Sequence, residues 1–231
     1  MKTPIKIPSL SRRSLLLSVG SAALAGCTLP DLKNLVGPPA PLRIYVLAPQ
    51  RPAPAAAGPA LRWQLGVALP ESTAGLDTTR IAVFPTATTM DYFTNAAWAD
   101  RAPVLIQSLL VQALEDTRRV AVARDTAGVA ADYVLQTELR DFQAFYDSPL
   151  PPPPLDPEAP PSPRPPPIII VQIETKLMSV PDRRIVGSFN AMTRATAATN
   201  SVEGTVAAFN QALGQALSQI VDWTLRTPPN T

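Results

Sequence analysis

Apolar and polar residues alternate along much of the second half of the chain, which is the pattern of strands with one buried face. In residues 133–146 the alternation changes phase near Arg140 and Asp141, so a β-bulge is expected there. The complete set of predicted strands covers residues 43–48, 62–69, 80–84, 88–93, 120–123, 133–146, 168–179 and 185–193.

The last two predicted strands are separated by a short turn. Pro181 and Asp182 are residue types that favour turns, so residues 168–179 and 185–193 are expected to pair as a hairpin. On the returning strand, the side chains expected to face the core are Ile185, Phe189 and Ala191.

Two segments repeat apolar residues every three or four positions, which predicts helices at residues 102–119 and 201–225. Asp100 is expected to cap the first helix, and Asn200 with Glu203 has the spacing of a capping box at the second. The apolar stripe of the second helix is expected to dock on the sheet of its own chain. A partner protein is the alternative for that stripe.

These elements predict an α/β fold: a mixed β-sheet with at least two packed helices, in a single globular domain over residues 42–227. The order of strand 80–84, helix 102–119 and strand 120–123 predicts a right-handed parallel crossover.

A proline-rich segment interrupts the domain. Twelve of the chain's 28 prolines lie between Pro149 and Pro167, a composition that favours extended polyproline II structure. Residues 148–167 are therefore predicted to be an insert between two strands, either an arm that touches a partner or a segment with no partner. Residues 228–231 are expected to be a disordered tail.

The start of the chain has the organisation of a secretory signal. Four basic residues and no acidic one precede an apolar stretch at residues 14–23. This stretch is too short to span a membrane as a helix. Leu24, Ala25 and Gly26 then stand directly before Cys27, in a pattern that resembles a lipobox. Residues 1–26 are therefore predicted to be a lipoprotein signal peptide that is cleaved before Cys27.

Cys27 is the only cysteine, so it has no disulfide partner in the chain. Covalent diacylglycerol and an N-acyl chain on Cys27 would account for it, because two or more acyl chains anchor a protein stably. Residues 27–41 are then a lipidated, flexible tether on the periplasmic face of the cell envelope. Thr28 favours the outer over the inner membrane, while Arg12 and Arg13 leave both the general and the twin-arginine export routes open.

Removing the predicted signal changes the charge of the chain. The sequence has 20 basic and 18 acidic residues, and the signal takes four of the basic ones. The remaining 16 basic and 18 acidic residues give a net charge of −2, which provides no electrostatic argument for binding nucleic acid.

The residues needed for common catalytic sites are missing. The chain has no histidine, which removes Ser–His–Asp and Cys–His catalysis and the commonest metal ligand. Paired carboxylates could still hydrolyse a glycoside. The nearest candidates are more simply surface or capping acids: Asp91, Asp100, Glu138 and Asp141. We therefore expect no enzyme, no metal site and no cofactor besides the covalent lipid.

Aromatic residues gather before the first predicted helix. Tyr92, Phe93 and Trp98 could form a satellite core under a loop, or a contact surface for a partner protein or lipid. The core interpretation is favoured, and the contact surface is the alternative.

Four segments, in order behind the lipobox, carry a resemblance to a known family. They are residues 44–49 (IYVLAP), 75–83 (GLDTTRIAV), 91–103 (DYFTNAAWADRAP) and 131–142 (ADYVLQTELRDF). Over roughly residues 42–223, the chain resembles the auxiliary lipoproteins of ABC-type transport systems. That group includes the lipoprotein of the paraquat-inducible, MCE-type system. The long proline-rich insert departs from the shorter hairpin of the family.

The resemblance implies a non-catalytic accessory lipoprotein of a system that moves lipids between the inner and outer membranes. Its implied partners are an MCE-domain substrate-binding protein, an ABC permease and ATPase, and further copies of itself in a homo-oligomer. Two alternatives remain: a periplasmic lipoprotein that itself carries lipid, and an envelope structural or assembly lipoprotein unrelated to transport.

Overall fold

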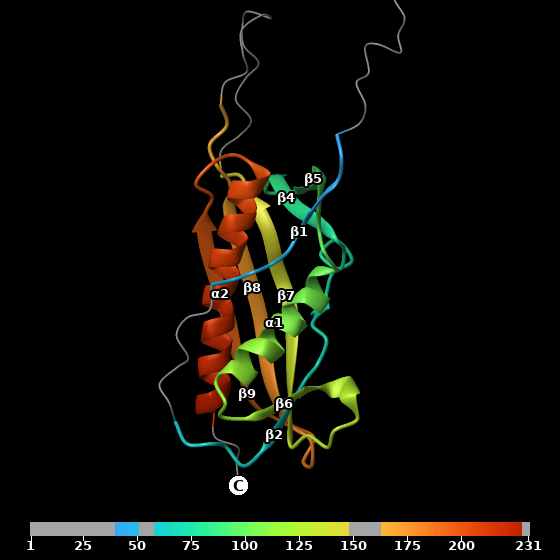
Figure 1. Cartoon of the computed structure of the whole chain (residues 1–231), viewed down its shortest axis with the longest axis vertical. Coiled ribbons are helices and arrows are strands. Elements are labelled where there is room, and N and C mark those ends of the chain that lie inside the picture. Colours follow the sequence, from blue (N-terminus) through green and yellow to red (C-terminus); the bar gives the residue numbers. More distant parts are fainter. Residues whose placement is uncertain (1–39, 51–57, 148–162, 228–231) are drawn as a thin grey trace, which may run out of the picture. The chain divides into compact units, whose positions relative to one another are not determined.

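The computed structural model describes residues 40–50, 58–147 and 163–227, which belong to one compact unit. They form a nine-stranded mixed sheet and two long helices, α1 (Ala102–Asp116) and α2 (Val202–Arg226), as Figure 1 shows. The predicted α/β class is confirmed. The strands are β1 (Arg43–Tyr45), β2 (Gln64–Val67), β3 (Glu71–Ser72), β4 (Arg80–Thr86), β5 (Thr89–Trp98), β6 (Ala121–Arg124), β7 (Tyr133–Phe145), β8 (Ile168–Ser179) and β9 (Arg184–Thr196).

The sheet combines antiparallel and parallel pairs around β7. On one side β7, β8 and β9 run antiparallel to one another, and on the other side β7 pairs in parallel with β2, β3 and β4. The parallel relation predicted for strands 80–84 and 120–123 is confirmed, because β4 is parallel to β7, β7 to β2, and β2 to β6. The strand that directly precedes α1 differs in direction. That strand is β5, which runs antiparallel to β4 and therefore also to β6. The sequence pattern had suggested only a short strand before the helix, whereas β5 extends to Trp98.

The predicted bulge in β7 is confirmed. Leu139 pairs with Ile173, and Asp141 pairs with the adjacent residue Gln172. Arg140 therefore has no partner of its own and is the extra residue. The extra residue changes the phase of the strand, and Phe142 is therefore buried like the inward residues before the bulge.

A second register shift corrects one inward residue of the hairpin. The shift lies between Leu177 and Met178, and it makes Met178 the partner of Ile185. Ile185 is consequently 57% exposed, so its prediction as a core residue was wrong. Ala191 is fully buried and Phe189 is half-buried against the core, as expected.

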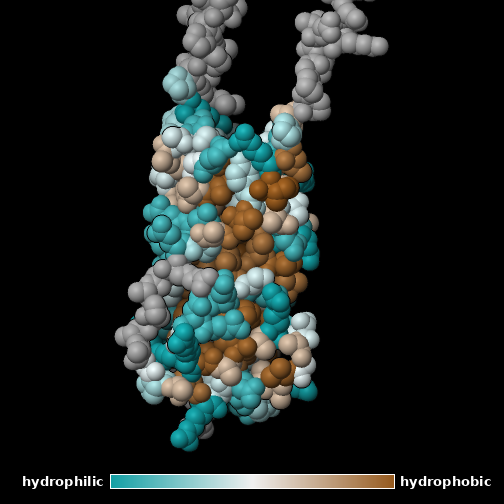
Figure 2. Space-filling model, viewed as in Figure 1, coloured by the Kyte–Doolittle hydropathy of each residue, from teal (hydrophilic) through white to brown (hydrophobic). Residues whose placement is uncertain are grey.

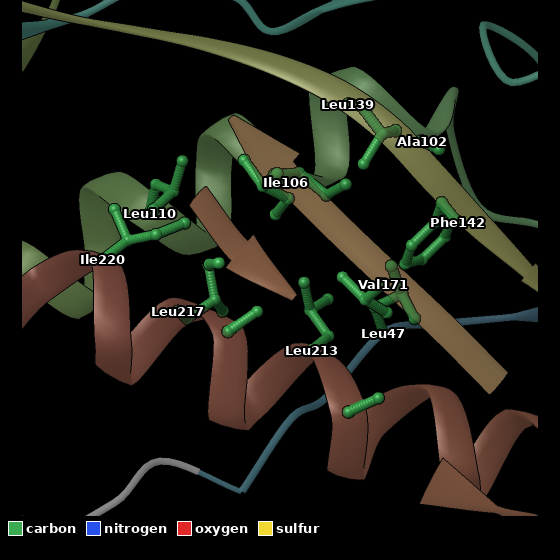
Figure 3. Packing of buried hydrophobic residues seen from close by; sticks show 14 of the residues in the cluster. Leu47, Ala102, Ile106, Leu110, Leu139, Phe142, Val171, Leu213, Leu217 and Ile220 are labelled. Atoms are coloured by element: carbon green, nitrogen blue, oxygen red, sulfur yellow. The ribbon is translucent and has the colours of Figure 1, made fainter. Parts of the chain in front are cut away.

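The core lies between the sheet and the two helices, which cover the same face of the sheet (Figure 1). The apolar stripe of α2 packs on β8 and β9, which confirms docking on its own sheet, and α1 contacts both α2 and β2. Figure 3 shows side chains of both helices meeting those of β7 and β8. Burial of this cluster is the main stabilising term of the fold. Its labelled members include Ile106, Leu110, Leu139, Phe142, Val171, Leu213, Leu217 and Ile220.

Helix α1 begins and ends differently from the prediction. Its N-cap is Arg101 and no side chain caps it, because Asp100 accepts a hydrogen bond from the backbone N–H of Arg101 instead. Pro103 lies in the first turn, where a missing N–H costs nothing. The helix ends at Asp116, and Arg118 adopts a left-handed φ of 53° that a helix cannot continue through.

The cap of α2 is also one residue later than predicted. Ser201 is the N-cap, and its hydroxyl accepts a hydrogen bond from the backbone N–H of Gly204 at 3.0 Å. Asn200 instead accepts a hydrogen bond from the Tyr146 hydroxyl at 2.6 Å. The predicted Asn200 cap was therefore wrong, because its side chain is used in a tertiary contact.

Candidate functional site

The first described residues are held against the core by a strap formed by residues 42–50. It begins in β1, which pairs in parallel with β5, and then crosses towards α2 (Figure 1). Within the strap, Leu47 is only 5% exposed and packs in the core cluster. The first described segment of the chain is therefore held by the sheet at one end and by the helix layer at the other.

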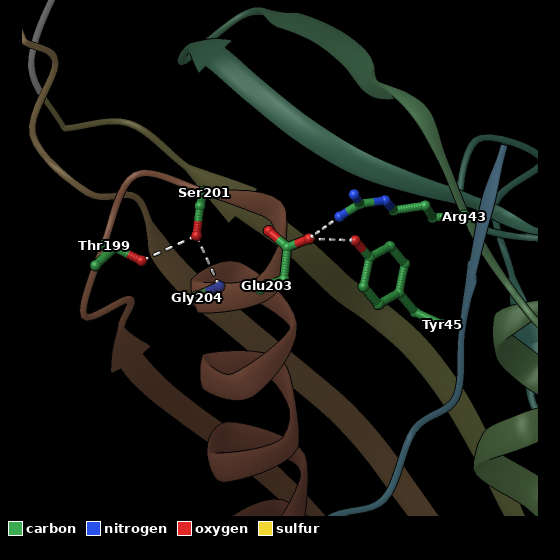
Figure 4. Close-up of polar contacts among 6 residues, drawn as sticks. All are labelled: Arg43, Tyr45, Thr199, Ser201, Glu203 and Gly204. Carbon is green, nitrogen blue, oxygen red and sulfur yellow. Dashed lines mark hydrogen bonds and ion pairs between the residues drawn. The ribbon is translucent and has the colours of Figure 1, made fainter. Parts of the chain in front are cut away.

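A polar contact fastens the strap to the first turn of α2. Arg43 donates to a carboxylate oxygen of Glu203 at 2.5 Å, and the Tyr45 hydroxyl donates to the same oxygen at 3.0 Å (Figure 4). The charged groups are solvent-exposed, which makes the ion pair weak on its own. Together with Leu47, however, it defines where the strap lies.

The same contact shifts two pKa values. The pKa of Glu203 is lowered, first by a hydrogen bond from its own backbone N–H and then by the Tyr45 hydroxyl and the Arg43 guanidinium. The pKa of Arg43 is raised, first by the Tyr45 hydroxyl and then by the Glu203 carboxylate. Both shifts favour the charged pair that holds the strap.

The end of the strap lies against the middle of α2. The backbone N–H of Ala48 donates to the Asn210 side chain at 2.8 Å. The strap then passes close to Gly214, one helical turn after Asn210. A Cβ added to Gly214 would lie 2.8 Å from the carbonyl oxygen of Gln50 and 3.4 Å from Cβ of Pro49. A glycine in the middle of this helix therefore permits the close approach of the strap backbone.

A hollow of about 610 Å³ lies beside this contact. Its lining has no charged side chain, and it includes three amide side chains of α2: Asn210, Gln211 and Gln215. Amide and hydroxyl groups suit hydrogen-bonding ligands better than an acyl chain.

The three aromatic residues predicted as a site all lie in β5, but they do different things. Trp98 is 2% exposed and meets Phe142 and Phe209 with ring centroids 5.8 and 5.2 Å apart, so it belongs to the main core. Tyr92 is half-buried, and its hydroxyl donates to the backbone carbonyl of Gly75, in the loop between β3 and β4, at 3.1 Å. Phe93 is half-buried against the core, and a contact role for these two residues stays a prediction.

The four candidate carboxylates are engaged separately. Asp91 and Asp100 each accept a hydrogen bond from the backbone N–H of the next residue. Glu138 forms an ion pair with Arg140, and Asp141 accepts a hydrogen bond from the Gln143 side chain. The described residues contain no group of three or more metal-binding side chains placed to hold an ion.

Cys27, with Leu24, Ala25 and Gly26 before it, lies outside the described residues, as does most of the proline-rich insert. The described end of the insert is tied to the sheet, where the guanidinium of Arg164 stacks 3.5 Å from the ring centroid of Tyr146.

Sequence reasoning missed the strap contacts. Glu203 was assigned to a capping box, but its carboxylate faces Arg43 and Tyr45. One available signal was Gly214, a glycine inside a strong helical pattern, which often marks a close backbone approach.

No helix in the described part of the chain is long and apolar enough to cross a membrane.

Comparison with known proteins agrees with this architecture. No curated protein is significantly similar to the chain. The crystal structure of protein XCC0632 from Xanthomonas campestris, of family DUF330, is 29% identical with a TM-score of 0.69, covering 80% of this chain and 95% of that one. A second, uncharacterized protein of known structure is 13% identical with a TM-score of 0.59, covering 80% and 99%, and shows the fold alone. The model of the ABC-type transport auxiliary lipoprotein component family matches residues 45–221, and the chain therefore belongs to that family.

Proposed function

We propose that this chain is the non-catalytic accessory lipoprotein of an MCE-type ABC system that moves lipids between the inner and outer membranes. The observation that carries the proposal is the family match over residues 45–221 in a chain whose start has the pattern of a lipoprotein signal. Lipid on Cys27 anchors the domain, with the outer membrane as its site. An MCE-domain protein, the permease and the ATPase are its partners, and further copies complete a homo-oligomer.

The geometry of the domain supports an accessory role. The four candidate carboxylates hold backbone groups or neighbouring side chains rather than converging on a shared cleft. The hollow beside α2 has Asn210, Gln211 and Gln215 in its wall, and these amides suit hydrogen-bonding ligands better than an acyl chain.

Two measurements on the native protein test the proposal. The mass of the N-terminal peptide should correspond to cleavage after Gly26 with diacylglycerol and an N-acyl chain on Cys27. Affinity capture from gently solubilised envelopes, with Cys27→Ser as control, should recover an MCE protein together with its permease and ATPase.

Other outcomes are informative. Phospholipid bound to the non-acylated Cys27→Ser protein would add a carrier role. If a folded, acylated protein captures neither transport components nor lipid, the transport proposal fails and a structural envelope role is favoured.

A further inference from the structure

Three large apolar side chains on the strap point away from the core. Leu42, Ile44 and Val46 are 61%, 56% and 65% exposed. Tyr45 and Leu47 face the protein instead, because Tyr45 contacts α2 and Leu47 is buried. An alternating segment with an apolar outer face as well as an inner one is unusual on a soluble surface.

Apolar surface also lies beyond this stripe. Figure 2 shows hydrophobic surface gathered on the face of the domain that carries β1 and α1. Helix α1 has no charged residue between Ala102 and Leu114, and Leu105 and Leu109 are only half-buried on it. A helix at a water-facing surface normally carries charged residues along its outer side.

The charge of the N-terminal region fits an anionic surface. Residues 32–70 contain no acidic residue, although the mature chain as a whole is slightly acidic. The same stretch contains Lys33, Arg43, Arg51 and Arg62, of which Arg43 is neutralised by its ion pair with α2. Basic residues near an anionic lipid surface contribute attraction that falls off within a Debye length.

The stripe is also close in sequence to the predicted anchor. Leu42 follows Cys27 by 15 residues, which can span at most about 50 Å when fully extended. An anchor at Cys27 would keep the strap close to the bilayer and so raise its effective concentration there. Even a small apolar surface could then bind the membrane.

We propose that Leu42, Ile44 and Val46 form a membrane-contact stripe, which rests in the interfacial region of the bilayer that carries the lipid anchor. The lipid anchor itself rests on the proposed function, but the affinity of the stripe for a bilayer does not require acylation or any transport partner.

The test measures binding of the mature chain, starting at residue 27 with Cys27→Ser, to vesicles of phosphatidylethanolamine and phosphatidylglycerol. All of the core lies within residues 40–227, so this chain keeps the domain intact. Replacing Leu42, Ile44 and Val46 together by Asn should lower the vesicle partition coefficient about tenfold or more. A matched control replaces three exposed apolar residues elsewhere by Asn and should leave binding unchanged: Val129, Val180 and Ile185, which are 51%, 41% and 57% exposed.

Three results would overturn the proposal: no vesicle binding by the parent protein, equal loss in the matched control, or binding that high salt abolishes completely. Light scattering adds a fourth, since a change of oligomeric state in the stripe variant would assign the stripe to a second copy of the chain. Thermal unfolding of both variants verifies that they are folded. Capture of transport partners by the acylated protein is a separate readout, so failure of the stripe leaves the proposed function standing.

Discussion

The Tyr45 hydroxyl lies 3.0 Å from a carboxylate oxygen of Glu203, and this contact joins the first strand of the domain to the first turn of its last helix. The two residues are 158 positions apart in the sequence. Because Arg43 binds the same oxygen, the strap is held partly by a carboxylate whose charge depends on pH.

Replacing Glu203 by Gln should make the domain slightly less stable near neutral pH, and the difference should disappear in acid. The folded-state pKa of Glu203 is lowered, so its stabilising contribution is complete above the unfolded value of about 4.3 and is lost as the pH falls through the lower folded value. Urea midpoints of the parent and the variant, measured from neutral pH downward, should converge below about pH 4. The matched substitution Glu115→Gln, at an exposed position of α1, should leave the urea midpoint at neutral pH close to that of the parent. A pH-independent difference for Glu203→Gln would contradict the assignment.

Replacing Gly214 by Ala should lower stability, although Ala is the better helix former by about 1 kcal/mol. The added Cβ would lie 2.8 Å from the Gln50 carbonyl oxygen, and a backbone atom cannot move as cheaply as a side chain. We expect a net loss of about 1–2 kcal/mol in chemical denaturation and faster amide exchange at Ala48. Gln211→Ala, on the exposed side of the same helix, should be neutral or slightly stabilising. A Gly214→Ala protein more stable than the parent would show that the strap does not press on the helix.

Substitutions at Trp98 and Tyr92 should separate a core role from a contact role. Trp98→Ala empties a space between Phe142 and Phe209 and should cost about 3–5 kcal/mol of unfolding free energy. Tyr92→Phe removes one hydrogen bond and should cost about 1 kcal/mol. Weakened partner capture by a stably folded Tyr92→Ala protein, but not by Tyr92→Phe, would instead support the contact surface.

The spacing of apolar residues along the chain predicts much of this fold. The change of phase at Arg140 is visible in the sequence because apolar residues on both sides of it must face one core. Ile185 shows the limit of the same reasoning. It fits an inward pattern, but the register shift opposite Met178 turns it outward, and nothing in its own strand reveals that shift.

The contacts of the strap could not be predicted from the local sequence pattern, because they join residues that are far apart in the chain. Glu203 has the right spacing for a capping box, and only the position of β1 in the folded sheet brings Arg43 and Tyr45 to its carboxylate. Asn200 was assigned as a cap for a similar reason, whereas its side chain accepts a hydrogen bond from Tyr146, which directly follows β7. Polar side chains with both a local and a tertiary partner cannot be assigned from spacing alone.

Deleting Arg140 should be tolerated, because the deletion would leave a regular β7. Leu139 and Phe142 both face the core and pair with alternate residues of β8, Ile173 and Val171, so removing the extra residue leaves every inward side chain in place. The expected cost is about 1–2 kcal/mol, from lost twist and the weak ion pairs of the guanidinium.

The control for this deletion is the removal of Gln136, an exposed residue of the same strand that pairs in regular register. Its deletion would turn either Tyr133 and Leu135 or the whole rest of the strand to the opposite face, and several buried side chains would be lost from the core. We expect no cooperatively folded protein from this control in thermal unfolding, while the Arg140 deletion keeps a single cooperative transition. Loss of the cooperative transition in both deletion variants would contradict this expectation. It would mean that the bulge is needed for the pairing of β7, beyond its effect on which side chains face the core.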